Sequence, residues 1–98
     1  MYRAVICDQY EVCETLLNNG ADPNIPNSLG QIPLHSACES GNTAITELLL
    51  NHNSDCNYQS GTGDSPLHYA AGRGDVIILR MLLEHGAIPN LTNKVSNR

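Results

Sequence analysis

The chain has no tryptophan and no phenylalanine, and tyrosine is its only large aromatic residue. A core without these side chains must be built from leucine, isoleucine, valine, alanine and cysteine. Small and aliphatic side chains allow helices to approach closely, and they bury little surface per residue. At 98 residues we expect one domain with an ordinary stability of about 5–15 kcal/mol.

Basic residues are also scarce, with five lysines and arginines against ten acidic residues and a net charge of −5. Nucleic-acid binding needs a basic face to neutralise phosphates, so we expect no nucleic-acid partner. The sequence contains no signal peptide pattern and no apolar run long enough to span a bilayer. We therefore expect no membrane partner. An acidic surface suits a neutral or basic protein partner.

The four cysteines do not form a Cys-x-x-Cys pair, and they fall at different phases of the pattern described below. Cysteines used as small apolar side chains, without disulfides, are typical of a reducing compartment. We therefore expect an intracellular protein, cytoplasmic or nuclear, without structural zinc or any other cofactor.

The most informative feature that is present is a repeat with a period of 33 residues. The tripeptide Pro33-Leu34-His35 recurs at positions 66–68, and the pair Leu16-Leu17 recurs at positions 49–50 and 82–83. A fixed period of this length indicates a stack of similar units, each unable to bury its apolar face alone.

Each unit is predicted to contain two helices. Pro66 suits the first position of a helix, with Ser65 as the N-cap before it. Gly74 tolerates the left-handed conformation that ends a helix, and Asp75 can cap the next one. Ile78, Leu82 and Leu83 then recur at helical spacing, followed by a polar, turn-rich stretch. Ile32 stands where Ser65 stands in the next unit, so Ile32→Thr is expected to add a stabilising cap.

Residues 65–71 and 82–87, and their counterparts at 32–38 and 16–24, resemble the signature segments of ankyrin repeats. The resemblance covers essentially the whole chain. It implies an all-α solenoid in which antiparallel helix pairs stack side by side and the loops project as β-hairpin fingers. It also implies a protein-interaction module, an adaptor or scaffold, with no active site.

The period divides the single domain, residues 1–98, into units 1–24, 25–57 and 58–90, with the start of a further unit at 91–98. The unit 1–24 lacks the positions of a first finger, so we expect a truncated unit. We expect a monomer that forms one domain of a longer chain, with a free-standing small protein as the alternative.

The resemblance places partner binding on a concave face formed by finger tips and first helices. Tyr69 is the strongest single candidate, because it follows the structural His68 at a position expected to point away from the core, and tyrosine is enriched in binding hot spots. The full predicted set comprises Arg3, Leu29, Gln31, Ser36, Glu39, Ser40, Asp64, Tyr69, Arg73 and Lys94. An alternative is a nuclear reader of basic histone tails, for which Glu39 and Asp64 supply acidic groups.

Asparagines in the loops of ankyrin repeats are substrates of an iron- and 2-oxoglutarate-dependent hydroxylase. The preferred context resembles a leucine eight residues before the asparagine and an acidic residue two before it. Asn24 and Asn57 both have this context, whereas Asn90 follows Ile88 at the acidic position. The resemblance therefore implies modification at Asn24 and Asn57.

An enzyme or a metal protein remains a remote alternative. Ser65, His68 and Asp64 have the residue types of a hydrolase triad. Neighbouring positions around a helix cap rarely supply the geometry that a triad needs. We expect no catalytic residues and no metal ligands.

Overall fold

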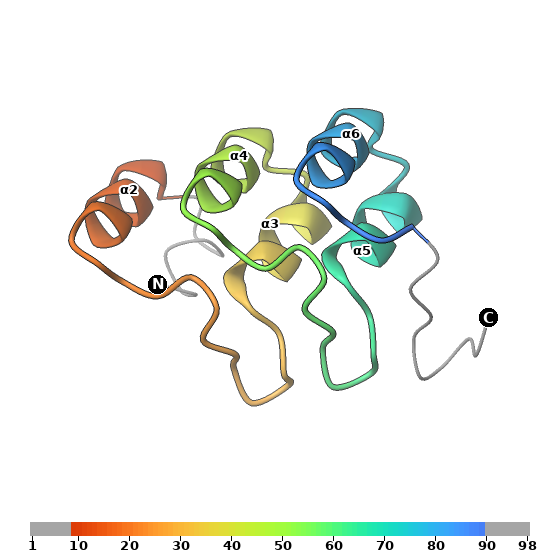
Figure 1. The fold of residues 1–98 in the computed structure, drawn as a ribbon, viewed down its shortest axis with the longest axis horizontal. Coiled ribbons are helices and arrows are strands. Elements are labelled where there is room, and N and C mark those ends of the chain that lie inside the picture. The colour runs from red at the N-terminus through yellow and green to blue at the C-terminus, as the bar shows by residue number, and fades with distance from the viewer. Residues whose placement is uncertain (1–8, 90–98) are drawn as a thin grey trace.

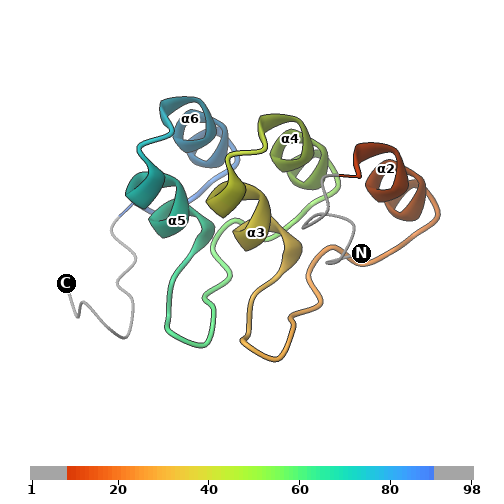
Figure 2. The same ribbon diagram turned by 180° about the vertical axis from the view of Figure 1, so that it is seen from behind.

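The computed structural model describes residues 9–89, and within that range it contains five helices in two rows (Figure 1). One row contains α2 (Tyr10–Asn18), α4 (Thr43–Asn51) and α6 (Val76–Glu84). The other contains α3 (Pro33–Ser40) and α5 (Pro66–Arg73). Helices of each row lie side by side, and long loops project to one side of the stack, as the view from behind also shows (Figure 2). The predicted helix-pair solenoid is thus confirmed.

Two-residue turns join the helices of each pair. We call α3 and α5 the inner helices, and α2, α4 and α6 the outer helices. Gly41 and Gly74 end α3 and α5 in the left-handed conformation, with φ of 74° and 76°, which costs glycine little. The following residue then caps the outer helix. Asp75 accepts a hydrogen bond from the Ile78 backbone N–H at 3.1 Å, and Asn42 acts in the same way in the preceding unit. These turns keep the two rows antiparallel.

One apolar core runs through the described units. Inner helices α3 and α5 contact each other, and α4 lies between α2 and α6 in the outer row. The largest fully buried aliphatic side chains include Leu34, Ile45, Leu49, Ile78 and Leu82. Cys38 is also fully buried in this core, where desolvation raises the pKa of its thiol to about 12. It acts as a small apolar side chain.

Ile32 belongs to the same core, and this reverses the expected effect of Ile32→Thr. Its side chain is fully buried, and its backbone N–H already donates to His35 Nδ1 at 2.9 Å. A threonine here would lose apolar contacts within a filled core. The sequence comparison with Ser65 identified the correct position at the helix start, but it did not show which way the side chain points.

The loops after the outer helices are tied to one another by asparagine side chains. Asn24 Oδ1 accepts from the Asp55 N–H at 2.7 Å, and Asn57 Oδ1 accepts from the Ile88 N–H at 2.8 Å. Each amide also donates to a carbonyl of the following loop. In the middle loop Asn53 takes a left-handed φ of 66° at the place that glycine occupies elsewhere.

The projecting loops, called fingers below, span residues 27–31 and 60–64. No strand is assigned within residues 9–89, so the expected β-hairpins are reduced to tight turns. The first is closed by the Asn27 N–H, which donates to the Gln31 carbonyl at 2.8 Å, and the second by the Ser60 N–H, which donates to the Asp64 carbonyl at 2.8 Å. A second backbone bond lies within each turn, from the Gly30 N–H to the Asn27 carbonyl at 2.9 Å and from the Gly63 N–H to the Ser60 carbonyl at 2.8 Å, and together these bonds keep the fingers narrow.

In the described part of the chain, no helix is long and apolar enough to cross a bilayer. The helices there are eight or nine residues long, whereas a spanning helix needs about 20.

Candidate functional site

A hollow lies between the two fingers and the start of α5. It is open to solvent and has a volume of about 600 Å³. The two finger tips provide its walls and Tyr69 provides its floor. Its lining consists of Asn27, Ser28, Leu29, Gly30, Gln31, Ser60, Gly61, Thr62 and Tyr69. We call it the finger hollow.

The two fingers pack backbone against backbone at the rim of this hollow. The Gly61 N–H donates to the Leu29 carbonyl at 2.9 Å. A Cβ atom on Gly30 would lie 2.7 Å from the Gly61 nitrogen, and one on Gly61 would lie 2.8 Å from the Leu29 oxygen. Side chains do not fit at either position without separating the fingers. The hollow is therefore preformed, which lowers the entropic cost of binding.

Tyr69 is half-buried and packs against the core, so the expectation that it points away from the helices is only partly right. Its ring meets that of His35 edge-on, with centroids 5.3 Å apart and an interplanar angle of 84°. Its phenol oxygen accepts a hydrogen bond from Gln31 Nε2 at 3.0 Å. The phenol thus joins the base of one finger to the floor of the hollow.

His35 supports this floor from inside the core, where it is fully buried. Nδ1 accepts the Ile32 N–H at 2.9 Å, so the proton of the neutral ring lies on Nε2. That Nε2–H donates to the Asp64 carbonyl at 3.0 Å. Burial lowers the pKa of His35 below its ordinary value of 6.5. The imidazole therefore ties the second finger to the helix start of the preceding unit as a neutral ring.

Polar side chains within each finger are fixed by hydrogen bonds inside the same finger. Asn27 Oδ1 accepts from the N–H groups of Leu29 and Gln31, at 2.9 and 3.0 Å. Thr62 Oγ1 donates to the Asp64 carboxylate at 2.9 Å. The hollow is consequently rimmed by oriented polar groups around one exposed apolar side chain. Leu29 is 67% exposed.

The predicted binding residues separate into two groups. The structure brings Leu29, Gln31 and Tyr69 together in the finger hollow, with Asp64 in the adjoining finger. The rest of the described set lies on α3 and α5. Ser36 lies within α3 and is half-buried, whereas the residues at the ends of these helices, Glu39, Ser40 and Arg73, are exposed. Arg3 and Lys94 lie outside the described residues.

Arg73 has a defined place at the far end of α5. Its guanidinium lies over Gly41, where a Cβ atom would collide with it. It also donates weakly, at 3.5 Å, to the carbonyl of Glu39. The arginine therefore covers the turn between α3 and α4, in the preceding unit. Arg73 is not among the residues that line the finger hollow.

The predicted set did not include Asn27, Ser28, Gly30, Ser60 and Gly61, which also line the finger hollow. Asn27 and Ser60 are one period apart, which was a signal that both form the turn of a finger. Gly61 carried no such signal, because its counterpart is Ser28. Only the contact between the two fingers explains why position 61 is a glycine.

Ser65 and His68 do lie together, but not as a catalytic pair. Ser65 Oγ is 3.0 Å from His68 Nδ1, and the same nitrogen accepts the Ser65 N–H at 2.8 Å. The serine is buried, so a substrate cannot reach its hydroxyl, and the Asp64 carboxylate accepts a hydrogen bond from Thr62. Among residues 9–89 there is also no group of three potential metal ligands.

Stacked helix pairs, short capped turns and projecting fingers define a repeat solenoid. The chain belongs to the ankyrin-repeat family, since the family model for ankyrin repeats, in three copies, matches residues 1–93.

Two curated relatives are similar over a shorter stretch. NF-kappa-B inhibitor alpha from Homo sapiens and from Sus scrofa are each 46% identical over 41 residues. That stretch is 42% of this chain and 13% of either relative. The chain thus spans only a small part of the curated relatives that it matches.

Proposed function

We propose that this chain is a protein-interaction module, an adaptor or scaffold and not an enzyme, which holds a segment of a partner protein in the finger hollow. The observation that carries the proposal is Leu29, which is 67% exposed at the edge of a preformed hollow with Tyr69 as its floor. An exposed apolar side chain beside a half-buried aromatic ring, surrounded by polar groups, is the usual anatomy of a binding hot spot.

The partner segment that fits has one apolar side chain flanked by polar groups. The apolar side chain would lie between Leu29 and Tyr69. The phenol of Tyr69 accepts from Gln31 and can still donate its own hydrogen to a partner carbonyl. Thr62, at the tip of the second finger, is exposed on the other side of the hollow. Glu39, Ser36, Ser40 and Arg73 would extend the contact along the concave face.

Charge narrows the class of partner. Residues 9–89 carry nine acidic side chains and two arginines, Arg73 and Arg80. Such a surface repels nucleic acid and favours a neutral or basic protein segment. We propose an intracellular setting, with no cofactor, since the described cysteines are buried and form no disulfide with one another. The short match to an inhibitor of NF-kappa-B supports a protein partner, not a particular one.

A basic histone tail is the second candidate, and Glu39 is the residue that favours it. This carboxylate is exposed at the end of α3. The Asp64 carboxylate already accepts the Thr62 hydroxyl, which leaves it less available to a lysine. A histone tail would bind mainly through charge, so its affinity would fall steeply with salt. A segment anchored in the hollow would depend on salt far less.

The test begins with capture of partners from a cell lysate, followed by isothermal titration of the captured segment. Leu29→Ser is expected to weaken binding about fivefold to thirtyfold, the scale of a hot spot worth about 1–2 kcal/mol. Ile77→Ser is the matched control, because Ile77 is 62% exposed on α6, far from the fingers (Figure 1). Equal losses in both variants, or no loss in Leu29→Ser, would reject the finger hollow as the site.

A further inference from the structure

The turn between α5 and α6 carries an exposed apolar pair away from the fingers. Val76 and Ile77, on the first turn of α6, are 60% and 62% exposed. Their counterparts on α4, Thr43 and Ala44, are exposed as well, although α4 lies between α2 and α6 in the outer row. A neighbouring unit on either side therefore does not cover these two positions.

Of the three outer helices, α6 is the one with aliphatic side chains at both positions. The helix α4 has a threonine and an alanine there, and α2 has a tyrosine and a glutamate. Adjoining aliphatic side chains that stay in water mark a contact surface more often than single ones do. Val76 and Ile77 line an open hollow of about 540 Å³ together with Arg73, Gly74 and Asp75.

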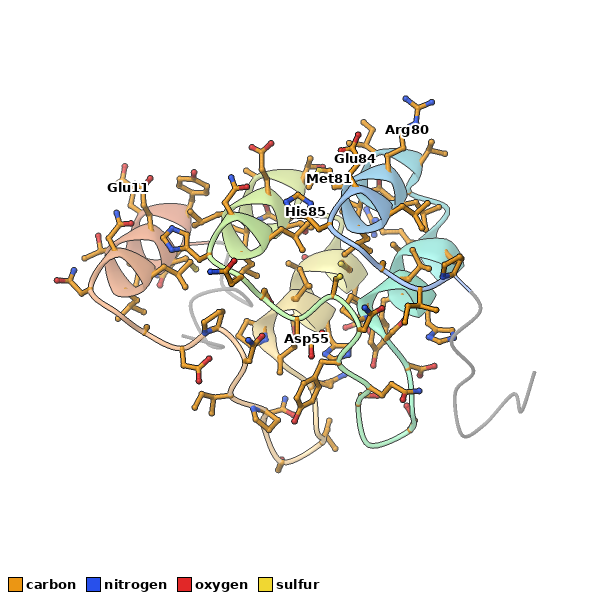
Figure 3. The ribbon with its side chains drawn as sticks, viewed as in Figure 1. Glu11, Asp55, Arg80, Met81, Glu84 and His85 are labelled. Carbon is orange, nitrogen blue, oxygen red and sulfur yellow. The ribbon has the colours of Figure 1, made fainter. Side chains whose placement is uncertain are left out.

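Both arginines of residues 9–89 flank this pair. Arg73 ends α5 just before the turn, and Arg80 lies about one helical turn after Ile77. Both are exposed, and Arg80 extends away from the ribbon at the edge of the molecule (Figure 3). The equivalent positions in the preceding unit are Ser40 and Glu47, so one negative charge there is replaced by two positive charges here. We call Arg73, Val76, Ile77 and Arg80 the turn patch.

The carboxylates around the turn patch belong to other positions. Asp75 caps α6 and accepts a backbone N–H of that helix at 3.1 Å, and a helix N-terminus is itself partly positive. Glu84 ends α6, one turn beyond Arg80. Glu39 and Glu47 lie in the preceding unit, on α3 and α4. The turn patch itself presents two positive charges and an apolar pair, on a chain that is acidic overall.

We propose that the turn patch docks a second partner, an acidic segment that carries an apolar side chain. The apolar side chain would cover Val76 and Ile77, and the carboxylates beside it would pair with Arg73 and Arg80. An apolar centre with charged groups around it is the usual anatomy of a protein interface.

This contact is independent of the finger hollow, which suits a neutral or basic segment. The two hollows share no lining residue. Arg73 is the one residue that the wider concave-face contact would also use, so Ile77 and Arg80 are the residues that distinguish the two surfaces. One chain can then hold two segments of opposite charge at once, which is what a scaffold does.

Titration of the ¹⁵N-labelled 98-residue chain, followed by NMR, tests the proposal with two synthetic peptides. The first is a 12-residue amphipathic peptide of leucine and glutamate, and the second has lysine in place of each glutamate. The acidic peptide should shift the amide signals of residues 73–80 to saturation, and the basic peptide should not. Added salt should weaken the acidic peptide's binding, because it screens the arginine–carboxylate pairs.

Ile77→Ala and Arg80→Glu each introduce the residue that α4 has at the same position, so both variants should fold, and their own NMR spectra establish this. Each should weaken binding of the acidic peptide about fivefold or more. Two controls should bind it like the unmodified chain. They are Ala44→Ser, at the phase of Ile77 on α4, and Leu29→Ser, in the finger hollow.

Four results would overturn the proposal. The first is an acidic peptide that leaves the signals of residues 73–80 in place, and the second is a basic peptide that shifts them equally. The third is unchanged affinity in Ile77→Ala and Arg80→Glu. In the fourth, the acidic peptide shifts the signals of the fingers instead, which would also contradict the charge preference proposed for the finger hollow. The first three results would leave the proposal for the finger hollow standing.

Discussion

The buried ring of His35 donates from Nε2 to the backbone carbonyl of Asp64 at 3.0 Å, and so links two successive units. The same ring accepts the Ile32 N–H through Nδ1. Both bonds require the neutral imidazole, since protonation of Nδ1 would remove the acceptor. The stability of the stack is thereby coupled to pH.

Acidification below neutrality should destabilise the protein through His35. Its pKa is lowered in the folded chain by burial, whereas the unfolded chain keeps the ordinary value of 6.5. The unfolded state therefore binds the proton first, and the free energy of unfolding falls as pH drops below about 6.5. Urea unfolding at a series of pH values measures this slope.

His35→Gln is the comparison variant, since glutamine can both accept and donate a hydrogen bond but does not titrate. It should be less stable near neutral pH and should lose less stability between neutrality and mildly acidic pH. Parallel slopes for the two proteins would show that other groups cause the acid sensitivity.

Ser54→Ala should stabilise the chain. The Ser54 hydroxyl is the buried side-chain atom for which residues 9–89 provide no hydrogen-bond partner. Ala21 and Ala87 occupy the same phase in the other units, so alanine fits this place. Removal of an unsatisfied buried hydroxyl should add about 1 kcal/mol to the free energy of unfolding. A urea midpoint that does not rise would contradict this account.

Ile32→Thr should lower stability by about 1–2 kcal/mol, because it removes buried apolar atoms and places a hydroxyl in a fully buried site. Ser65→Thr, which keeps a hydroxyl at the equivalent position, serves as the control and should change stability less. An increase in the urea midpoint of Ile32→Thr would instead favour the helix-capping argument from sequence.

Tyr69→Ala should weaken partner binding by at least ~1–2 kcal/mol, measured by isothermal titration. It should also lower stability, because the ring packs on His35. Tyr69→Phe keeps that packing and removes the hydroxyl, which accepts from Gln31 and can donate to a partner, so it separates the contribution of the ring from that of the hydroxyl. Glu84→Ala, on the outer row where this side chain points outward (Figure 3), should leave binding unchanged. A larger loss of binding in Glu84→Ala than in Tyr69→Ala would place the interface on the convex side.

Incubation with the asparaginyl hydroxylase, iron(II) and 2-oxoglutarate should add one oxygen atom to Asn24 or Asn57 before Asn90, which lies outside the described residues. The amides of Asn24 and Asn57 both bridge successive loops, so the loop must detach before the side chain enters an active site. Mass spectrometry of proteolytic peptides identifies the site. Modification of Asn90 alone would reverse the expected order.

Much of the fold follows from the repeat itself. Pro66 at the start of α5, Gly74 at its end and Asp75 as the next cap each act through their own backbone neighbourhood, so local sequence suffices to place them. The finger hollow was only partly foreseen. Leu29, Gln31 and Tyr69 were in the predicted set, but their meeting depends on residues of two different units.

The sequence by itself determined the period, the helix pairs, their turns and the family, because each of these depends on residues close together in the chain. Tertiary structure decided the direction of individual side chains. Ile32 and Ser65 share a phase and are both buried, but one fills the core and the other bonds a histidine. Val12 and Ile45 also share a phase, and the first is half-exposed while the second is buried. Ile45 is covered because α4 packs against α2, a contact that only the assembled stack supplies.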